Sequence, residues 1–326
     1  MMTLTYLKIL IYTAEFHFIR LWANLFNYPL TALPKYNYEQ KRVLNDSVKK
    51  LLSDWKPISG RAYSFDDLDI SRHLNSFVLV LNDLKSFLVR KFNNDSHDIS
   101  KSLFDESCPD YFKRNYHYQT DGYFTKNSAF IYDHQIELLF MGTCHLMRKV
   151  SYSLLKVDRD SHFSCLEIGA GSGTSAKQFL NLYPLAKIDI LDASEGYLEA
   201  AKSLYGDHFN DYICSFIESY QSTKKYDVIY ICFTMHEIPV EIWPVVIERI
   251  RSLLSDNGHF LVIDAMQDGD RQDVQFALDD FEQDYYEPYF EKYRKTQLET
   301  YIENCGFSLE ARNDVLFSKA LVFKKN

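Results

Sequence analysis

The residues whose types and spacing best suit chemistry lie between Cys165 and Asp192. Three glycines occupy alternate positions, 169, 171 and 173, directly after a short apolar run, and Asp192 ends the next apolar run. Glycine permits positive φ and lets a ligand approach the backbone with no Cβ in the way. A carboxylate at the end of a neighbouring parallel strand can accept hydrogen bonds from the two hydroxyls of a ribose. The pattern therefore predicts a nucleoside-binding loop between two strands.

The glycine spacing also discriminates between nucleotides. A dinucleotide-binding loop of the form Gly-x-Gly-x-x-Gly that began at Gly169 would need a glycine at position 174, which is Thr174. The pattern Glu-x-Gly-x-Gly-x-Gly at 167–173 instead resembles the first motif of the class I S-adenosylmethionine (SAM) methyltransferases. This resemblance covers about residues 160–326. A tight strand-to-helix turn without a ligand is the alternative interpretation.

The resemblance implies SAM as the cofactor and assigns residues to it. Glu167 would lie near the methionine amino group, the glycine loop would run along the cofactor, and Asp192 would hold the ribose. The acid that the family often places after the third strand is missing or displaced here, so Ser215 could bond to the adenine and Phe216 could stack on it. The implied cofactor-binding residues are Glu167, Gly169, Ala170, Gly171, Gly173, Asp192, Ala193, Ser215, Phe216 and Phe233.

His236 and Glu237 follow the fourth predicted strand. Amino methyltransferases acting on nucleobases or glutamine carry Asn/Asp-Pro-Pro-Tyr/Phe at this position, and this sequence does not. The stretch 233–239 resembles that of small-molecule relatives, in which a His-Glu pair lies beside the transferred methyl group. A phenol, carboxylate or amine acceptor can require removal of a proton, and histidine has a suitable pKa. His236 and Glu237 are therefore the candidate catalytic residues; alternatively, they only cap the following helix or shape its loop.

Two further segments are candidates for contacting the substrate. Residues 110–150 place polar side chains between aromatic ones, and such buried polar groups need partners that either a ligand or the loop itself can supply. Residues 279–291 hold six acids and five aromatics. These residues could form a binding wall for a cationic amine. Alternatively, they form an amphipathic helix packed on the N-terminal domain. The candidate substrate-binding residues are His117, Gln119, Tyr123, Tyr132, Gln135, Asp264 and Tyr286.

These residues need a parallel sheet to position them, and the chain supplies alternating apolar and amphipathic runs from residue 163 onward. The predicted fold class is α/β: a doubly wound, mostly parallel seven-stranded sheet of the class I methyltransferase type, preceded by an all-helical N-terminal domain. The predicted domains are a helical lid and substrate domain at 1–150 and a SAM-binding methyltransferase domain at 151–326. A helix-start pattern lies at 64–67. The predicted strands are Cys165–Ile168, Ala186–Leu191, Tyr212–Phe216, Tyr226–Phe233, His259–Asp264, Leu309–Arg312 and Ala320–Phe323.

Composition narrows the partners and the compartment. Residues 1–150 carry a net charge of +3 and residues 151–326 carry −12, so the catalytic half should repel phosphate backbones, and no nucleic acid is expected. The six cysteines form no Cys-x-x-Cys pair, and without clustered ligands no metal is expected. The apolar N-terminus is interrupted by Lys8, Glu15 and Arg20 and resembles neither a membrane span nor a signal peptide. A cytoplasmic protein is expected, whose first helix packs on the core, on a membrane surface or on a second subunit in a homodimer.

The sequence thus predicts a SAM-dependent methyltransferase that methylates O or N of a small acceptor, aromatic or amine-bearing. Carbon methylation of a quinone-like lipid is an alternative supported by the apolar N-terminus. A SAM-binding regulatory protein without turnover is an alternative of a different class. A nicotinamide-dependent oxidoreductase is disfavoured by Thr174.

Overall fold

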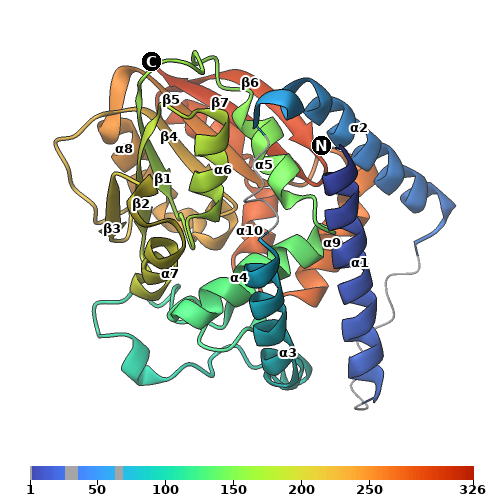
Figure 1. The fold of residues 1–326 in the computed structure, drawn as a ribbon. Helices are drawn as coiled ribbons and strands as arrows, with labels where there is room; N and C mark the ends of the chain where they lie inside the picture. The colour runs from blue at the N-terminus through green and yellow to red at the C-terminus, as the bar shows by residue number, and fades with distance from the viewer. Residues whose placement is uncertain (1, 26–35, 63–68) are drawn as a thin grey trace.

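The computed structural model describes residues 2–25, 36–62 and 69–326, and its central sheet confirms the predicted fold class. The strand order is β3-β2-β1-β4-β5-β7-β6 (Figure 1). The first five strands are parallel, whereas β7 runs antiparallel between β5 and β6. The helix-start pattern at 64–67 lies outside the described residues. The strands are β1 (Ser164–Ile168), β2 (Lys187–Asp192), β3 (Asp211–Cys214), β4 (Tyr226–Cys232), β5 (Leu254–Ala265), β6 (Phe307–Val315) and β7 (Ser318–Lys325).

Helices cover both faces of the sheet, which explains the continuous apolar run in β4. Successive residues of a strand point to opposite faces, so Tyr230 joins one apolar core while Ile229 and Ile231 join the other. One face is covered by α5 (Cys144–Tyr152), α6 (Thr174–Leu182) and α7 (Glu195–Tyr205). The other is covered by α8 (Trp243–Leu253), α10 (Phe290–Lys295) and α11 (Leu298–Asn304).

The N-terminal half is helical, and its helices pack in two groups. Helices α1 (Met2–Leu25), α3 (Ile70–Asn93) and α4 (Lys126–Leu139) form a separate small core. Helix α2 (Tyr38–Ala62) instead packs on α5 and contributes to the core of the sheet. The domain boundary near residue 150 therefore stays a prediction, because α5 follows the helical part yet covers the sheet. Within the described residues, none of the helices combines the length and the apolarity that a membrane crossing requires.

A polar network ties the helical part to the glycine loop. The carboxylate Oδ2 of Asp133, in α4, accepts hydrogen bonds from Arg72 of α3 at 2.5 Å and from Ser172 at 2.5 Å. It also accepts from Thr174 at 2.8 Å, at the start of α6. Charge-assisted hydrogen bonds of this kind are the stronger ones. The network fixes α3 and α4 over the carboxyl ends of the strands (Figure 1).

The stacking of α6 on the sheet gives a stability prediction. Phe179 is fully buried, and its ring stacks on that of Tyr230 with centroids 4.9 Å apart. We expect Phe179→Ala to lower the free energy of unfolding by ~3–5 kcal/mol, because it removes a buried ring and leaves a cavity. Denaturant unfolding measures this change, with the half-exposed Leu185→Ala as the matched control. Equal losses in the two variants would contradict the packing described.

Candidate active site

The glycine loop between β1 and α6 has the backbone that the alternate glycines predicted. Gly169, Gly171 and Gly173 have φ of 69°, 57° and 74°. A Cβ at Gly169 would lie 2.5 Å from Oγ1 of Thr234, and one at Gly173 would lie 2.7 Å from the ring of Phe209. Glycine is therefore required at both positions by the protein's own packing, whatever the loop binds.

Asp192, at the end of β2, fixes this loop. Its Oδ2 accepts a hydrogen bond from the Gly171 N–H at 2.7 Å, and its Oδ1 accepts one from the Ser194 N–H at 2.8 Å. Burial raises the pKa of Asp192 to about 6, although both backbone donors favour the charged form. Each carboxylate oxygen keeps a second lone pair for a further donor.

A cavity opens at the carboxyl ends of β1, β2 and β4, where ligands of parallel α/β sheets bind; we call it the nucleoside cavity. Every predicted cofactor residue except Gly173 lines it. Gly173 faces Phe209 instead. The predicted residues on its wall are Glu167, Gly169, Ala170, Gly171, Asp192, Ala193, Ser215, Phe216 and Phe233.

Glu167 provides the test of whether a cationic nucleoside fits this cavity. Its side chain is fully buried, and neither carboxylate oxygen has a hydrogen-bond partner among the described residues. Burial raises the pKa of Glu167 to about 8, although the nearby Ser175 and Tyr230 hydroxyls favour the charged form. These hydroxyls and Arg148, on the same cavity wall, only partly offset the cost of burying this acid, and an ammonium group would add the missing compensation. The residues present therefore fit the amino end of SAM.

Aromatic residues that the sequence did not single out complete the cavity. Tyr111 and Phe112 lie beside Phe216, with ring centroids 6.0 and 5.3 Å away. The Tyr111 hydroxyl donates to Glu218 at 2.8 Å, and Glu218 also lines the cavity. These side chains form an aromatic and acidic wall suited to an adenine ring. The only sequence signal was the aromatic segment itself, which does not say which ring faces a ligand.

The segment before α4 covers the cavity. Tyr116 and Tyr123 stack with centroids 4.9 Å apart, and the Tyr123 hydroxyl donates to Glu237 at 2.6 Å. Gln119 is fully buried and donates to the Gly122 carbonyl at 2.5 Å and to the Tyr197 hydroxyl at 3.0 Å. Gln119 therefore pins the loop, whereas Tyr123 lies on the wall of the nucleoside cavity.

A second, mainly apolar cavity lies behind Phe233; we call it the apolar cavity. Tyr132 and Phe233 line both cavities, so the two adjoin. Phe233 has the left-handed φ of 55°, which is uncommon for a bulky residue and marks a strained position. His117 and His236 are the polar predicted residues on the wall of the apolar cavity.

His236 forms a buried pair with Asp264. Its Nδ1 lies 2.6 Å from Oδ1 of Asp264, whose Oδ2 accepts a hydrogen bond from the Met235 N–H at 2.8 Å. Burial lowers the pKa of His236, but the Asp264 carboxylate outweighs burial and raises it to about 10. Asp264 thus lies behind His236 as its orienting partner, and it does not line either cavity.

A second buried group of titratable side chains lies close to His236. It includes Glu287, which the sequence analysis did not predict as a site residue. Nε2 of His117 is 3.2 Å from Oε1 of Glu287 and 3.9 Å from Oε1 of Glu237, without hydrogen-bond geometry to either. Burial lowers the pKa of His117 to about 3, raises that of Glu237 to about 7 and raises that of Glu287 well above its usual value. The group is therefore largely uncharged at neutral pH, apart from Glu237, which is near its midpoint.

Other predicted substrate residues lie elsewhere. Gln135 lines a third cavity, near Phe16 and Asp284. Tyr286 lies against Tyr118, with ring centroids 5.7 Å apart. It lines neither the nucleoside cavity, nor the apolar cavity, nor the cavity of Gln135. The acids of 279–291 are mostly paired within the protein, with the pairs Arg294–Asp279, Arg294–Glu282 and Lys91–Asp284. The segment also forms part of the wall of the apolar cavity, through Asp280, Phe281, Asp284 and Tyr285, so its role as a wall for a cationic amine stays a prediction.

The spacing along the chain shows no cluster of metal ligands, but among the described residues the fold brings together two groups whose ligand atoms lie within 4.8 Å of one another. One is His117, Glu237 and Glu287, and the other is Glu15, His73 and His134. The expectation that no metal is bound stays a prediction, although the absence of clustered ligands no longer supports it.

The burial of Glu167 gives a pH-dependent prediction. Because its pKa is about 8 in the folded protein and about 4.5 when unfolded, its burial reduces stability progressively as the pH rises from about 4.5 to 8. We expect Glu167→Gln to raise the melting temperature of the ligand-free protein at pH 8 and to leave it unchanged at pH 4. Melting curves across this range measure the effect, with the exposed Glu199→Gln as control. A pH-independent difference would contradict the assignment.

Comparison with known proteins agrees with this architecture. Residues 166–260 match a family model described as a methyltransferase domain. Malonyl-[acyl-carrier protein] O-methyltransferase 1 of Ilyobacter polytropus is 39% identical over 69 residues, which is 21% of this chain and 26% of the relative. A malonyl-[acyl-carrier protein] O-methyltransferase of Halalkalibacterium halodurans is 31% identical over 137 residues, 38% of this chain and 49% of the relative. The chain thus spans less than half the length of these relatives.

Among solved structures, the pyocyanin biosynthetic protein PhzM shares the fold. Its TM-score is 0.52 at 14% sequence identity, and the match covers 79% of this chain and 74% of PhzM. The family match falls on the segment from β1 to β5, which carries the glycine loop, Asp192 and His236. Sequence motif, sheet order and family match agree: residues 166–260 match a methyltransferase domain, and they lie in a sheet with the strand order of the predicted class I fold.

Proposed function

We propose that this protein transfers the methyl group of SAM to an oxygen or nitrogen atom of a small molecule bound in the apolar cavity. The observation that carries the proposal is the position of the pair His236–Asp264. Glu237 lines the nucleoside cavity, and the neighbouring His236 lines the apolar cavity. A proton acceptor at this junction is what an O–H or N–H acceptor requires.

In this proposal the nucleoside cavity holds SAM. Glu167 would bind the ammonium group, Asp192 would accept from the ribose hydroxyls, and Phe216 with Tyr111 would contact the adenine. When bound, SAM supplies an electrophilic methyl group, so the protein mainly aligns the reactants and excludes water. The stacked Tyr116 and Tyr123 close the cavity from the side of the helical part.

His236 would take the proton of the acceptor. Its Nδ1 is occupied by Asp264, which leaves Nε2 as the atom that can face an acceptor. Asp264 fixes the orientation of the ring and stabilises the imidazolium that forms, as in other His–carboxylate pairs. With a pKa of about 10, His236 is mostly protonated at neutral pH in the ligand-free protein. A sulfonium cation in the adjoining cavity would lower this pKa, because like charges disfavour each other.

The character of the apolar cavity favours an aromatic acceptor. Its wall includes the rings of Phe281, Tyr285, Phe290 and Phe317, and flat apolar molecules bind such walls well. The curated relatives are named for a malonyl group on a carrier protein. A free carboxylate of that kind would approach Glu237 at the junction, which is partly ionised at neutral pH and would repel it.

A SAM-binding protein without turnover is the alternative of another class. It would bind the nucleoside but would have no use for an oriented proton acceptor at the junction. The arrangement of His236 and Asp264 supports the enzyme.

Binding of the product S-adenosylhomocysteine tests the role of Asp192. We expect Asp192→Ala to weaken this binding by ~1–3 kcal/mol, because hydrogen bonds to a charged acceptor and the anchoring of the glycine loop are lost. Isothermal titration calorimetry measures the affinity, and the exposed Asp207→Ala provides the control. An unchanged affinity for Asp192→Ala would refute the ribose assignment.

Methyl transfer tests the role of His236. Wild-type protein with methyl-labelled SAM should label at least one member of a set of phenols and aromatic amines. Its rate should rise with pH and level off at the pKa of His236, which is about 10 in the ligand-free protein and lower beside SAM, because the neutral imidazole is the active form. We expect His236→Gln to lower the rate about 10²–10⁴-fold and to abolish that rise.

The control for this experiment is the exposed His208→Gln, which should keep the wild-type profile. A His236→Gln variant with the wild-type rate and pH profile would exclude His236 as the base. S-adenosylhomocysteine binding without labelling of any acceptor of the set would favour the regulatory protein.

A further inference from the structure

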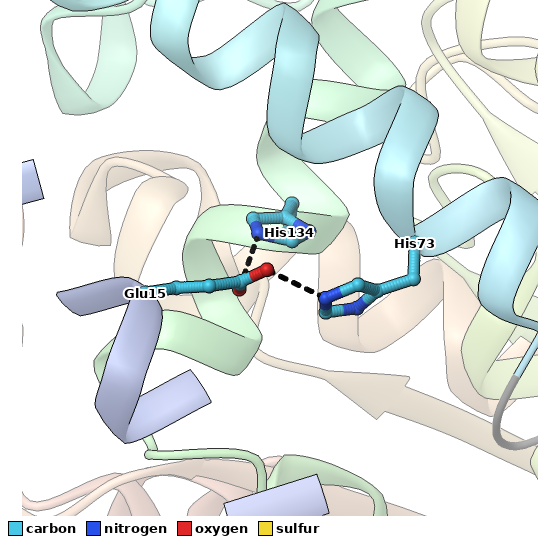
Figure 2. Close-up of side chains that lie close together, drawn as sticks. All are labelled: Glu15, His73 and His134. Carbon is cyan, nitrogen blue, oxygen red and sulfur yellow. Dashed lines mark hydrogen bonds and ion pairs between the residues drawn. The ribbon is translucent and has the colours of Figure 1, made fainter. Parts of the chain in front are cut away.

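A second site, outside both cavities, is formed by three helices of the N-terminal part. Glu15 of α1, His73 of α3 and His134 of α4 point toward one another (Figure 2). Oε1 of Glu15 lies 2.7 Å from Nε2 of His73, and Oε2 lies 3.1 Å from Nε2 of His134. The two contacts span 58 and 119 residues of the chain, so only the tertiary fold assembles the group.

The charge of Glu15 has no permanent counter-charge. Within 2–25, 36–62 and 69–326, no lysine or arginine pairs with it. Two nearby cations are engaged elsewhere: Arg72 pairs with Asp133, and Lys8 with Glu137. The side chains of Glu15, His73 and His134 are 11%, 12% and 2% exposed, so water screens this carboxylate poorly. A buried charge needs a compensating partner.

The surroundings of the group hold its ligand atoms in place. The ring of Tyr12 packs against both imidazoles, with centroids 5.0 and 5.2 Å away, and Phe77 packs on His134 at 5.7 Å. His73 and His134 also line a polar cavity whose wall includes Ser76 and Asn181. The two histidines are therefore packed against rings and also line a polar cavity, whereas Glu15 does not line it; a metal site with an open position is built in this way.

We propose that Glu15, His73 and His134 bind a divalent transition metal ion, with Zn²⁺ as the probe. Two imidazole nitrogens and one carboxylate form a set that Zn²⁺ and related ions accept, and a water molecule from the polar cavity would complete the coordination. The metal ion would supply the positive charge that balances the negative charge of the Glu15 carboxylate. The rival is a carboxylate that only accepts hydrogen bonds from the two imidazoles.

Metal binding here would tie α1 to the helices that cover the nucleoside cavity. His134 adjoins Asp133, and Asp133 bonds to Ser172 and Thr174 beside the glycine loop. A ligand that binds only the folded state stabilises it. The proposed metal ion would therefore stabilise the packing of the N-terminal helices. This role does not depend on the proposed methyl transfer or on its acceptor.

Zinc content tests the proposal with the full chain. After treatment with EDTA, dialysis and reloading with one equivalent of Zn²⁺, we expect one tightly held zinc per wild-type chain and a higher melting temperature than in EDTA. His73→Gln and Glu15→Gln should lose both the zinc and the thermal shift. The exposed His208→Gln is the matched control and should retain both. Co²⁺-loaded wild-type protein should show the visible absorption of histidine-bound cobalt, a measurement that needs no variant.

A fourth variant separates this site from the other ligand cluster. Glu287→Gln alters the group at the cavity junction and should leave zinc binding intact. The proposal is overturned if the wild type retains no zinc, if His73→Gln and Glu15→Gln hold zinc as the wild type does, or if only Glu287→Gln loses it.

Discussion

The site depends on one buried carboxylate, that of Glu167. It lies in β1, between β2 and β4, fully covered and without a hydrogen-bond partner among the described residues. The unfolded chain would solvate this group, so its position weakens the ligand-free protein. Such a cost is typical of functional sites. The Glu167 carboxylate offers a binding partner for a cation in the middle of the sheet, where the parallel strands end.

The rest of the site is arranged around the same edge. Asp192 ends the neighbouring strand and holds the glycine loop through its backbone N–H groups. On the other side of β1, Phe233 leaves β4 in a strained conformation and separates the nucleoside cavity from the apolar cavity. His236 and Glu237 follow within one turn. Two ligands bound in these cavities would meet where a histidine of raised pKa and a protein carboxylate already lie together.

The sequence predicted those parts of the site that local pattern determines. Glu167, Gly171 and Asp192 stand at fixed offsets from strand ends, so one strand–loop–helix–strand unit places them all. The role of Gly173 was not predictable in this way. A glycine required by packing against Phe209 and a glycine required by a ligand look identical in the sequence. Gln119 was ambiguous for a similar reason: a buried amide needs partners, and the sequence does not say whether protein or ligand provides them.

Most side-chain contacts between distant segments could not be predicted. Asp264 lies 28 residues from His236, and Glu287 reaches His117 from an insertion whose path no periodicity specifies. The cluster of Glu15, His73 and His134 depends on the packing of three helices, which is set by many weak side-chain contacts rather than by spacing. Metal ligands far apart in sequence are therefore invisible until the helices are placed.

Calorimetric titration of the ligand-free protein with S-adenosylhomocysteine and with NAD is the most direct test of the central claim, that Glu167 and Asp192 define a cavity for a SAM-type nucleoside. We predict that S-adenosylhomocysteine binds with proton release at pH 7, because an ammonium group beside Glu167 lowers the pKa of this residue from about 8, and that NAD does not bind. Binding of NAD, or binding of S-adenosylhomocysteine without any proton release, would contradict it.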